Sequence, residues 1–237
     1  MAQKLHCVVE QIIDHGERVY TLALRPERPV PRFLPGQFLH LALDPYDATG
    51  FWPESRVFSI ASPPARRDLV RITYAVHGRF TARMESELAE GKTAWIKMPY
   101  GDFVIEKHAE VVLFAGGTGI SAFTAFLGDL AATDDRPVTL AYGARTERLL
   151  IYRDDVERCA QRAPSLQVLY FIEQEDGGAP TAVHPGRVSV DAVWPRLRRP
   201  LDAHYYISGP PPMLRGIGQD LRSRHIAAEA IHIDAWE

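Results

Sequence analysis

Two glycine-bearing runs have residue types and spacing that suit phosphate binding. The run AGGTGIS at residues 115–121 follows an apolar stretch and precedes a helical pattern, and SGPPPM at residues 208–213 has the same setting. Glycine lets the backbone turn tightly and approach a ligand, while unpaired N–H groups at a helix N-terminus attract anions. Two such loops at the carboxyl ends of parallel strands predict a nucleotide-binding crevice. Taken alone, each run also fits a simple strand-to-helix turn, because neither has the complete G-x-G-x-x-G spacing.

A third run places a cationic side chain within a short extended segment. Residues 56–59 read RVFS, so that Arg56 interrupts what otherwise looks like a buried strand. A guanidinium group in such a strand needs either solvent or an anionic partner, because an unpaired buried charge is costly. One interpretation is therefore an exposed edge residue, with Phe58 in the core. The other is a counterion for a bound anion.

Composition excludes several classes of function. The chain has 237 residues and a net charge of −3, so it lacks the overall positive charge that would favour binding of nucleic acid. The two cysteines, Cys7 and Cys159, are too few for an iron-sulfur cluster. The nine histidines show no paired ligand spacing, so we predict no metal site. The N-terminus lacks the apolar core of a secretory signal, and we expect a cytoplasmic protein with reduced thiols.

Hydrophobic patterning divides the chain into two domains of different class. Period-two alternation at residues 19–24, 37–43, 71–76 and 93–98, with one helix near 81–89, predicts an antiparallel β-barrel or sandwich over residues 1–104. Apolar runs at 110–115, 138–142, 166–172, 204–208 and 230–233 alternate with helical patterns, including 149–160 and 213–222. This alternation of strands and helices predicts a doubly wound parallel α/β domain over residues 105–237. The uncharged stretch 111–128 is expected to be a buried strand and helix, and not a membrane span.

Five motifs, in this order and spacing, resemble those of the ferredoxin-NADP reductase family. They are RVFSIAS at 56–62, GRFT at 78–81, AGGTGIS at 115–121, YGART at 142–146 and SGPPPM at 208–213. The resemblance covers nearly the whole chain. It implies an N-terminal FAD-binding β-barrel of Greek-key type and a C-terminal domain that binds a nicotinamide nucleotide.

The resemblance also implies roles for individual residues of the first domain. In the family's R-x-Y-S motif the arginine neutralises the flavin pyrophosphate, the aromatic ring packs on the isoalloxazine, and the serine hydrogen-bonds near the reactive N5. Phe58 stands in place of the usual tyrosine, which removes a hydroxyl contact to the ribityl chain. Thr81 either contacts the pyrophosphate or only caps its helix, and Tyr74 and Val76 line the flavin or belong to the core. The flavin-binding residues implied are Arg56, Val57, Phe58, Ser59, Tyr74, Val76, Gly78, Arg79, Phe80 and Thr81.

In the second domain the resemblance implies a nicotinamide site. Ser208 replaces the cysteine of the family's CGPPPM form, and Trp236 matches a terminal aromatic residue that covers the flavin, although a structural role for it is open. Ser59, Thr118, Ser208 and Trp236 are the implied catalytic residues. Glu173 follows the third apolar run where NADP-dependent members place a phosphate-binding serine, which favours NADH over NADPH, although Arg145 could reach a 2′-phosphate. The nicotinamide-binding residues implied are Gly117, Thr118, Gly119, Arg145, Glu173, Gly209, Pro210, Met213 and Trp236.

The expected activity is an FAD-dependent oxidoreductase. It takes hydride from NADH, or NADPH, and passes electrons to a separate ferredoxin, oxygenase component or haem protein. The alternatives are an NAD(P)H:flavin reductase that uses free flavin as substrate, and a non-catalytic electron-transfer or docking subunit. Arginines of the first domain form either a docking face for an acidic ferredoxin or an ordinary solvated surface; they are Arg32, Arg66, Arg67, Arg71, Arg79 and Arg83.

Overall fold

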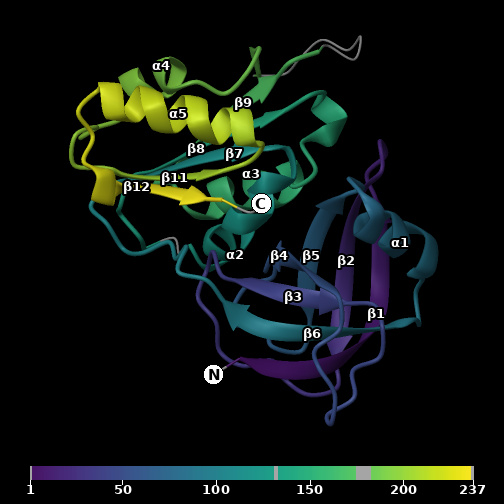
Figure 1. Ribbon diagram of the computed structural model, residues 1–237. Helices are drawn as coiled ribbons and strands as arrows, with labels where there is room; N and C mark the ends of the chain where they lie inside the picture. The colour runs from purple at the N-terminus through teal and green to yellow at the C-terminus, as the bar shows by residue number, and fades with distance from the viewer. Residues whose placement is uncertain (1, 131–132, 175–182, 236–237) are drawn as a thin grey trace. The chain divides into compact units, whose positions relative to one another are not determined.

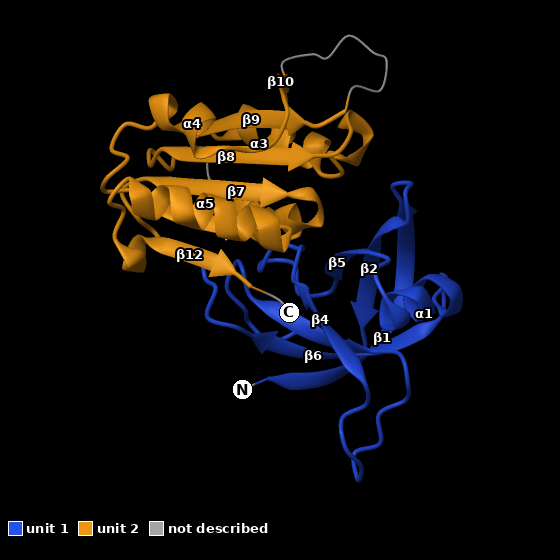
Figure 2. Cartoon of the chain, turned by 45° about the horizontal axis from the view of Figure 1, so that its top comes forward, with its two compact units in different colours: residues 1–104 blue, residues 105–237 orange. Residues whose placement is uncertain are grey.

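The computed structural model of the protein describes residues 2–130, 133–174 and 183–235. The chain forms two compact units, with unit 1 spanning residues 1–104 and unit 2 spanning residues 105–237 (Figure 2). Each unit has its own sheet. Within the described ranges, every helix is too short or too polar to cross a membrane.

Unit 1 is a six-stranded antiparallel sheet that curves toward closure (Figure 1). Its strands are β1 (Gln3–Asp14), β2 (Val19–Pro26), β3 (Phe38–Ala42), β4 (Ser55–Ser59), β5 (Val70–Ala75) and β6 (Thr93–Tyr100), in the order β4-β3-β6-β1-β2-β5. Strand β6 lies between β1 and β3, so the chain does not follow a simple up-and-down path. Just past β4, the N–H of Ala61 donates to the carbonyl of Arg71 at 2.8 Å, which links the two ends of the sheet. The antiparallel near-barrel predicted from the alternation is confirmed.

Helix α1 (Arg79–Glu87) packs on this barrel. It begins two residues earlier than the sequence pattern predicts, directly after Gly78. That glycine has φ 109° and ψ 179°, a conformation open essentially to glycine alone, which lets the chain turn straight into the helix. Phe80 and Met84 point inward and join the core with Leu22 and Ile72.

Unit 2 is a parallel six-stranded sheet between two layers of helices. Its strands are β7 (Val111–Gly116), β8 (Val138–Ala144), β9 (Leu166–Ile172), β10 (Val183–Pro185), β11 (His204–Ser208) and β12 (Ile231–Asp234). Its α-helices are α2 (Ser121–Asp129), α3 (Arg153–Arg162), α4 (Val190–Val193) and α5 (Pro211–Ser223). In Figure 1, α4 and α5 lie on one face of the sheet, and α2 and α3 lie on the other. Every residue of β7 and β8 is buried, as expected when both faces are covered.

The strand order of unit 2 reverses between β7 and β11. The order is β10-β9-β8-β7-β11-β12, so the chain winds outward from β7 to β10 and then returns to the opposite side of β7. Ligands of open α/β sheets bind at the carboxyl ends of the strands where the order reverses. Both glycine-bearing loops follow strands at this position. The predicted doubly wound fold is therefore confirmed.

Some elements differ from the sequence expectation. Strand β1, the short strand β10 and the four-residue helix α4 have no counterpart among the predicted elements. The helix predicted at 149–160 was wrong at its start. A 3-10 turn occupies Glu147–Leu149, and Tyr152 keeps a non-helical backbone (φ −113°, ψ 19°) before α3 begins at Arg153. The apolar Leu149 and Tyr152 have helical spacing to Val156 and Cys159 of α3, but they belong to the 3-10 turn and the loop that precede it.

Candidate functional site

The guanidinium group of Arg56 lies at the exposed edge of the unit 1 sheet. Its side chain is 53 % exposed on the edge strand β4, so no unpaired charge is buried. One terminal nitrogen donates to the Ser55 carbonyl at 2.9 Å, and the guanidinium carbon lies 5.2 Å from the centre of the Phe80 ring. The structure thus brings the RVFS and GRFT motifs together. Phe80 itself is buried under this contact and is 3 % exposed.

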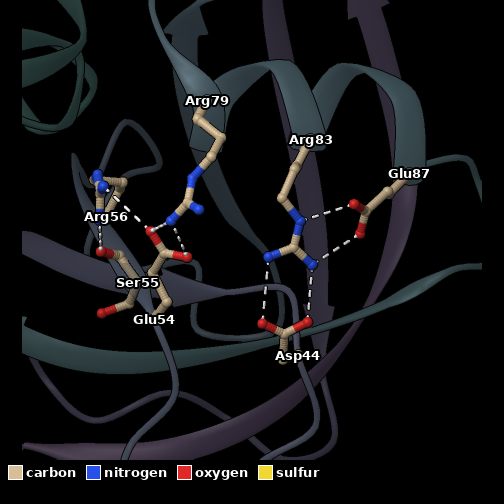
Figure 3. Close-up of polar contacts among 7 residues, drawn as sticks. All are labelled: Asp44, Glu54, Ser55, Arg56, Arg79, Arg83 and Glu87. Atoms are coloured by element: carbon tan, nitrogen blue, oxygen red, sulfur yellow. Dashed lines mark hydrogen bonds and ion pairs between the residues drawn. The ribbon is translucent and has the colours of Figure 1, made fainter.

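A carboxylate that sequence reasoning missed joins these two motifs. Glu54 accepts a hydrogen bond from Arg56 at 3.3 Å and two from Arg79 at 3.0 and 3.2 Å (Figure 3). Two guanidinium groups from different motifs therefore converge on one anionic group. No motif signals Glu54, because its role depends on the approach of α1 to β4.

The start of α1 offers backbone donors next to this arginine pair. Its N-cap is Gly78, and no side chain caps the first turn. The Thr81 hydroxyl instead accepts from the His77 N–H at 2.7 Å and donates to the Gly78 carbonyl at 3.3 Å. The expectation that Thr81 caps this helix at its first residue is therefore wrong, because Thr81 is the third helical residue. An uncapped helix start beside two arginines is a suitable setting for a diphosphate.

The other flavin-motif residues divide between surface and core. Val57, Phe58 and Ser59 on β4 are partly buried, and the Phe58 ring lies edge-on to Tyr74 at 6.3 Å. Tyr74 is only 4 % exposed, and burial raises the pKa of its hydroxyl. Val76 is partly buried against the same core. Tyr74 thus belongs to the barrel interior, while the β4 residues keep an accessible side.

In unit 2 the two glycine-bearing loops meet backbone to backbone. A side-chain carbon added to Gly119 would lie 2.4 Å from the Ser208 carbonyl oxygen and 2.7 Å from the Gly209 nitrogen. A carbon added to Gly116 would lie 2.5 Å from the Met213 sulfur and 2.9 Å from a ring carbon of Pro210. Contact this close requires glycine on the β7 side. The two loops therefore form one continuous rim at the switch point between β7 and β11.

The residues of this rim differ in exposure and conformation. Gly117 has φ +54° and open space around it, and Thr118 is partly exposed in the 3-10 turn Gly117–Ile120 that leads into α2. Gly209 is partly buried, while Pro210 is exposed at the N-cap of α5. This leaves backbone groups of the rim accessible to a ligand.

The side chain of Ser208 has a partner that sequence reasoning missed. Ser208 is 3 % exposed, and its hydroxyl donates to the Asp234 carboxylate at 2.8 Å across the β11–β12 pair. Asp234 is also buried, with 4 % exposed. Ser208 therefore serves as a hydrogen-bond donor within the sheet. Trp236, two residues further along, lies outside the described residues.

The predicted ribose end of the site lies on the loops after β8 and β9. The Gln174 N–H donates to the Arg145 carbonyl at 2.8 Å, so the two loops run side by side. Arg145 and Glu173 are both exposed. The Glu173 carboxylate accepts from Arg187 at 2.9 Å, and Arg187 is another residue that no motif identified.

Comparison with known proteins agrees with this architecture. Residues 113–219 match the oxidoreductase NAD-binding domain. The chain is 29% identical over 217 residues to the phenol 2-monooxygenase reductase component DmpP of Pseudomonas sp. (strain CF600), covering 87% of this chain and 58% of that protein. The chain thus spans little more than half the length of this relative.

Two solved structures have the same fold over almost the entire chain. The ferredoxin reductase in carbazole 1,9a-dioxygenase superposes with a TM-score of 0.82 at 21% identity, covering 100% of this chain and 70% of that one. A ferredoxin NADP+ reductase from Neisseria gonorrhoeae, with bound FAD and NADP, gives 0.77 at 18% identity and covers 98% of both chains. The chain therefore has the two-unit fold of these reductases, and residues 113–219 of its second unit match the oxidoreductase NAD-binding domain.

Proposed function

We propose that the protein is an FAD-dependent reductase that takes hydride from NADH and passes electrons to a separate acceptor, such as a ferredoxin or an oxygenase component. The observation that carries the proposal is the convergence of Arg56 and Arg79 at the uncapped start of α1. A diphosphate needs positive charge and several N–H donors in one place. These residues supply both, with Glu54 holding the guanidinium groups in position.

Each unit contributes a different part of the proposed reaction. In unit 1, Arg56, Arg79 and the first N–H groups of α1 bind the FAD diphosphate, Phe58 packs against the ring system, and Ser59 donates a hydrogen bond to it. In unit 2, the rim formed by the glycine loops admits the nicotinamide nucleotide, and Thr118 orients its carboxamide. When held by these residues, FAD would supply the redox chemistry, namely uptake of a hydride from the nicotinamide and release of its two electrons to the acceptor. The protein residues bind, orient and exclude water.

Free thiols support a cytoplasmic location for this activity, as part of the same proposal. Cys7 and Cys159, one in each unit, are both buried and form no disulfide. Burial raises the pKa of Cys7 to about 12 and raises that of Cys159 as well, so both stay as unreactive thiols.

A basic docking face for an acidic acceptor is supported by only part of the arginine set. Arg83 bonds to both Asp44 and Glu87 (Figure 3), and Arg79 pairs with Glu54. The Arg83 charge is therefore balanced within the unit, while Arg79 shares one carboxylate with Arg56 and is assigned above to the FAD diphosphate. Arg66 is 53 % exposed but also pairs with Asp68 at 3.7 Å, so it adds no unbalanced charge to such a face.

The preference for NADH is tested by changing the ribose end of the site. We expect Glu173→Ser with Gln174→Arg to raise the NADPH/NADH ratio of kcat/KM by about tenfold or more. The double variant removes the carboxylate that would repel a 2′-phosphate, frees Arg187 from its ion pair and adds a second guanidinium group. Glu229→Ser, which changes an exposed glutamate elsewhere in unit 2, is the control. An unchanged ratio in the double variant would refute the assignment of Glu173 to cofactor choice.

The decisive experiment for the proposal is the visible absorption spectrum of the purified chain, before and after anaerobic addition of NADH. We expect the yellow absorption of oxidised flavin, and its bleaching by NADH. A protein that takes up no FAD when it is offered contradicts the proposal. Flavin that NADH does not bleach indicates the non-catalytic subunit, while turnover only with added free flavin indicates the flavin reductase.

A further inference from the structure

Three histidines from separate parts of unit 2 meet beside its sheet. His204 opens β11, His232 lies on the edge strand β12, and His108 lies in the segment that precedes β7. One possible ligand nitrogen from each of them lies within 4.8 Å of the others. All three side chains are partly buried. In the sequence they are far apart, which is why no spacing pattern revealed them.

The contacts among the three rings are unusually close for imidazoles. The His108 and His204 rings stack with centroids 3.3 Å apart and an interplanar angle of 3°. His204 Nδ1 lies 3.0 Å from His232 Nε2, so these two nitrogens share one proton or face each other with lone pairs. Burial is the main cause that lowers the pKa of each ring. Neutral imidazole is the form that ligates metals.

Neighbouring groups orient the cluster from outside. The Tyr206 hydroxyl lies 3.1 Å from His108 Nε2 and accepts the Glu106 N–H at 3.2 Å, while its ring stacks on His232 at 4.4 Å. The Glu106 carboxylate is 70 % exposed and lies 4.0 Å from the same His108 nitrogen. A carboxylate oxygen thus lies close to the cluster, on a side chain that reaches solvent. A purely structural stack of rings would not need a carboxylate at this position.

We propose that His108, His204 and His232 form a binding site for a divalent transition metal ion, with Zn²⁺ as the best fit. Three imidazoles and one open position suit Zn²⁺, and imidazole also suits Cu²⁺ and Ni²⁺. A tetrahedral ion at about 2.0–2.1 Å from each nitrogen holds those nitrogens about 3.3 Å apart. Because the His108 and His204 rings are parallel, their in-plane lone pairs do not point at one ion. The His108 ring must rotate out of the stack to bind it, which its place outside the regular elements permits.

Such an ion would tie the entry segment of unit 2 to the last two strands of its sheet. The site uses none of the residues assigned to the flavin or the nicotinamide nucleotide. Its existence therefore does not depend on the proposed function.

Calorimetric titration of the full chain with Zn²⁺ tests the site, after stripping with a chelator. We expect one ion per chain in the parent, and at least tenfold weaker binding in each of His108→Gln, His204→Ala and His232→Ala. His225→Asn is the matched control, because His225 is exposed in unit 2 and asparagine tolerates its backbone at φ +64°. Cu²⁺ bound to the parent is expected to show coupling to three nitrogens by electron paramagnetic resonance.

Two results with the parent and the cluster variants would overturn the proposal. One is the absence of stoichiometric Zn²⁺ binding in the parent, and the other is equal affinity in the parent and the three cluster variants. Thermal unfolding in chelator checks the variants, and if the two strand variants do not fold, His108→Gln decides the matter alone because His108 lies in a loop. Equal loss of affinity in His225→Asn would also place the ion elsewhere.

Discussion

Replacing Gly119 with alanine is expected to cost unit 2 about 1–3 kcal/mol of stability and to weaken nicotinamide nucleotide binding about tenfold or more. The added carbon would meet the Ser208 carbonyl oxygen and carbon at 2.4 and 2.5 Å, and the Gly209 nitrogen at 2.7 Å. All three atoms belong to the backbone, so no side chain can rotate away. The loops at the ends of β7 and β11 must separate, and the rim that they form is lost. Urea denaturation and an NADH titration measure the two effects.

Gly216→Ala is the matched control for this prediction. Gly216 lies in α5, and a side-chain carbon there would find nothing within 4 Å. Alanine in a helix interior is more stable than glycine by about 0.5–1 kcal/mol, so this variant should be at least as stable as the parent and should bind the nucleotide equally well. If Gly119→Ala has the same stability and the same NADH affinity as the parent, the two loops are not in the described contact.

Replacing Arg56 with alanine is expected to weaken FAD binding by about 10- to 100-fold. Charge-assisted hydrogen bonds contribute about 1.5–3 kcal/mol each, and each 1.4 kcal/mol is a factor of ten in affinity. Removing Arg56 leaves Arg79 as the nearest cation for the diphosphate and leaves Glu54 with one partner fewer. The change also removes the guanidinium group that covers the Phe80 ring. The affinity is measured by titrating stripped protein with FAD and following the flavin fluorescence.

Two further variants separate charge from general disturbance of the barrel. Arg25→Ala removes an exposed arginine on β2 that pairs with Glu10 at 3.4 Å, and it should keep FAD as tightly as the parent. Arg56→Lys keeps the charge but loses the planar set of guanidinium donors. Its FAD affinity should therefore lie between that of the parent and that of the alanine variant. An alanine variant at position 56 that holds flavin like the parent would show that the diphosphate is bound elsewhere.

The hydrophobic pattern predicted the fold class because unit 1 repeats the two-residue period of strands, whereas unit 2 alternates apolar strands with helical patterns. Alternating side chains at 19–24 and 71–76 match β2 and β5, and the uncharged stretch at 111–128 becomes β7 and α2. Strand β1 shows how such patterning fails. Burial alternates from Leu5 to Val9, but the partly buried Val8 is apolar, so the residue types do not show this alternation. A bulge between Val9 and Gln11 then shifts the register and breaks the period of two. The short strand β10 has too few residues to show any period.

The amino-acid sequence by itself determined the kinds of group available: an arginine in a strand, glycines between strands and helices, and five motifs in family order. Only the tertiary structure decided which distant groups meet. Glu54 joins Arg56 to Arg79, Ser208 donates to Asp234, and His108 stacks on His204. The physical reason is that periodicity reports which face of an element is buried, whereas these contacts depend on strand order and register, which are set by the packing of the whole unit.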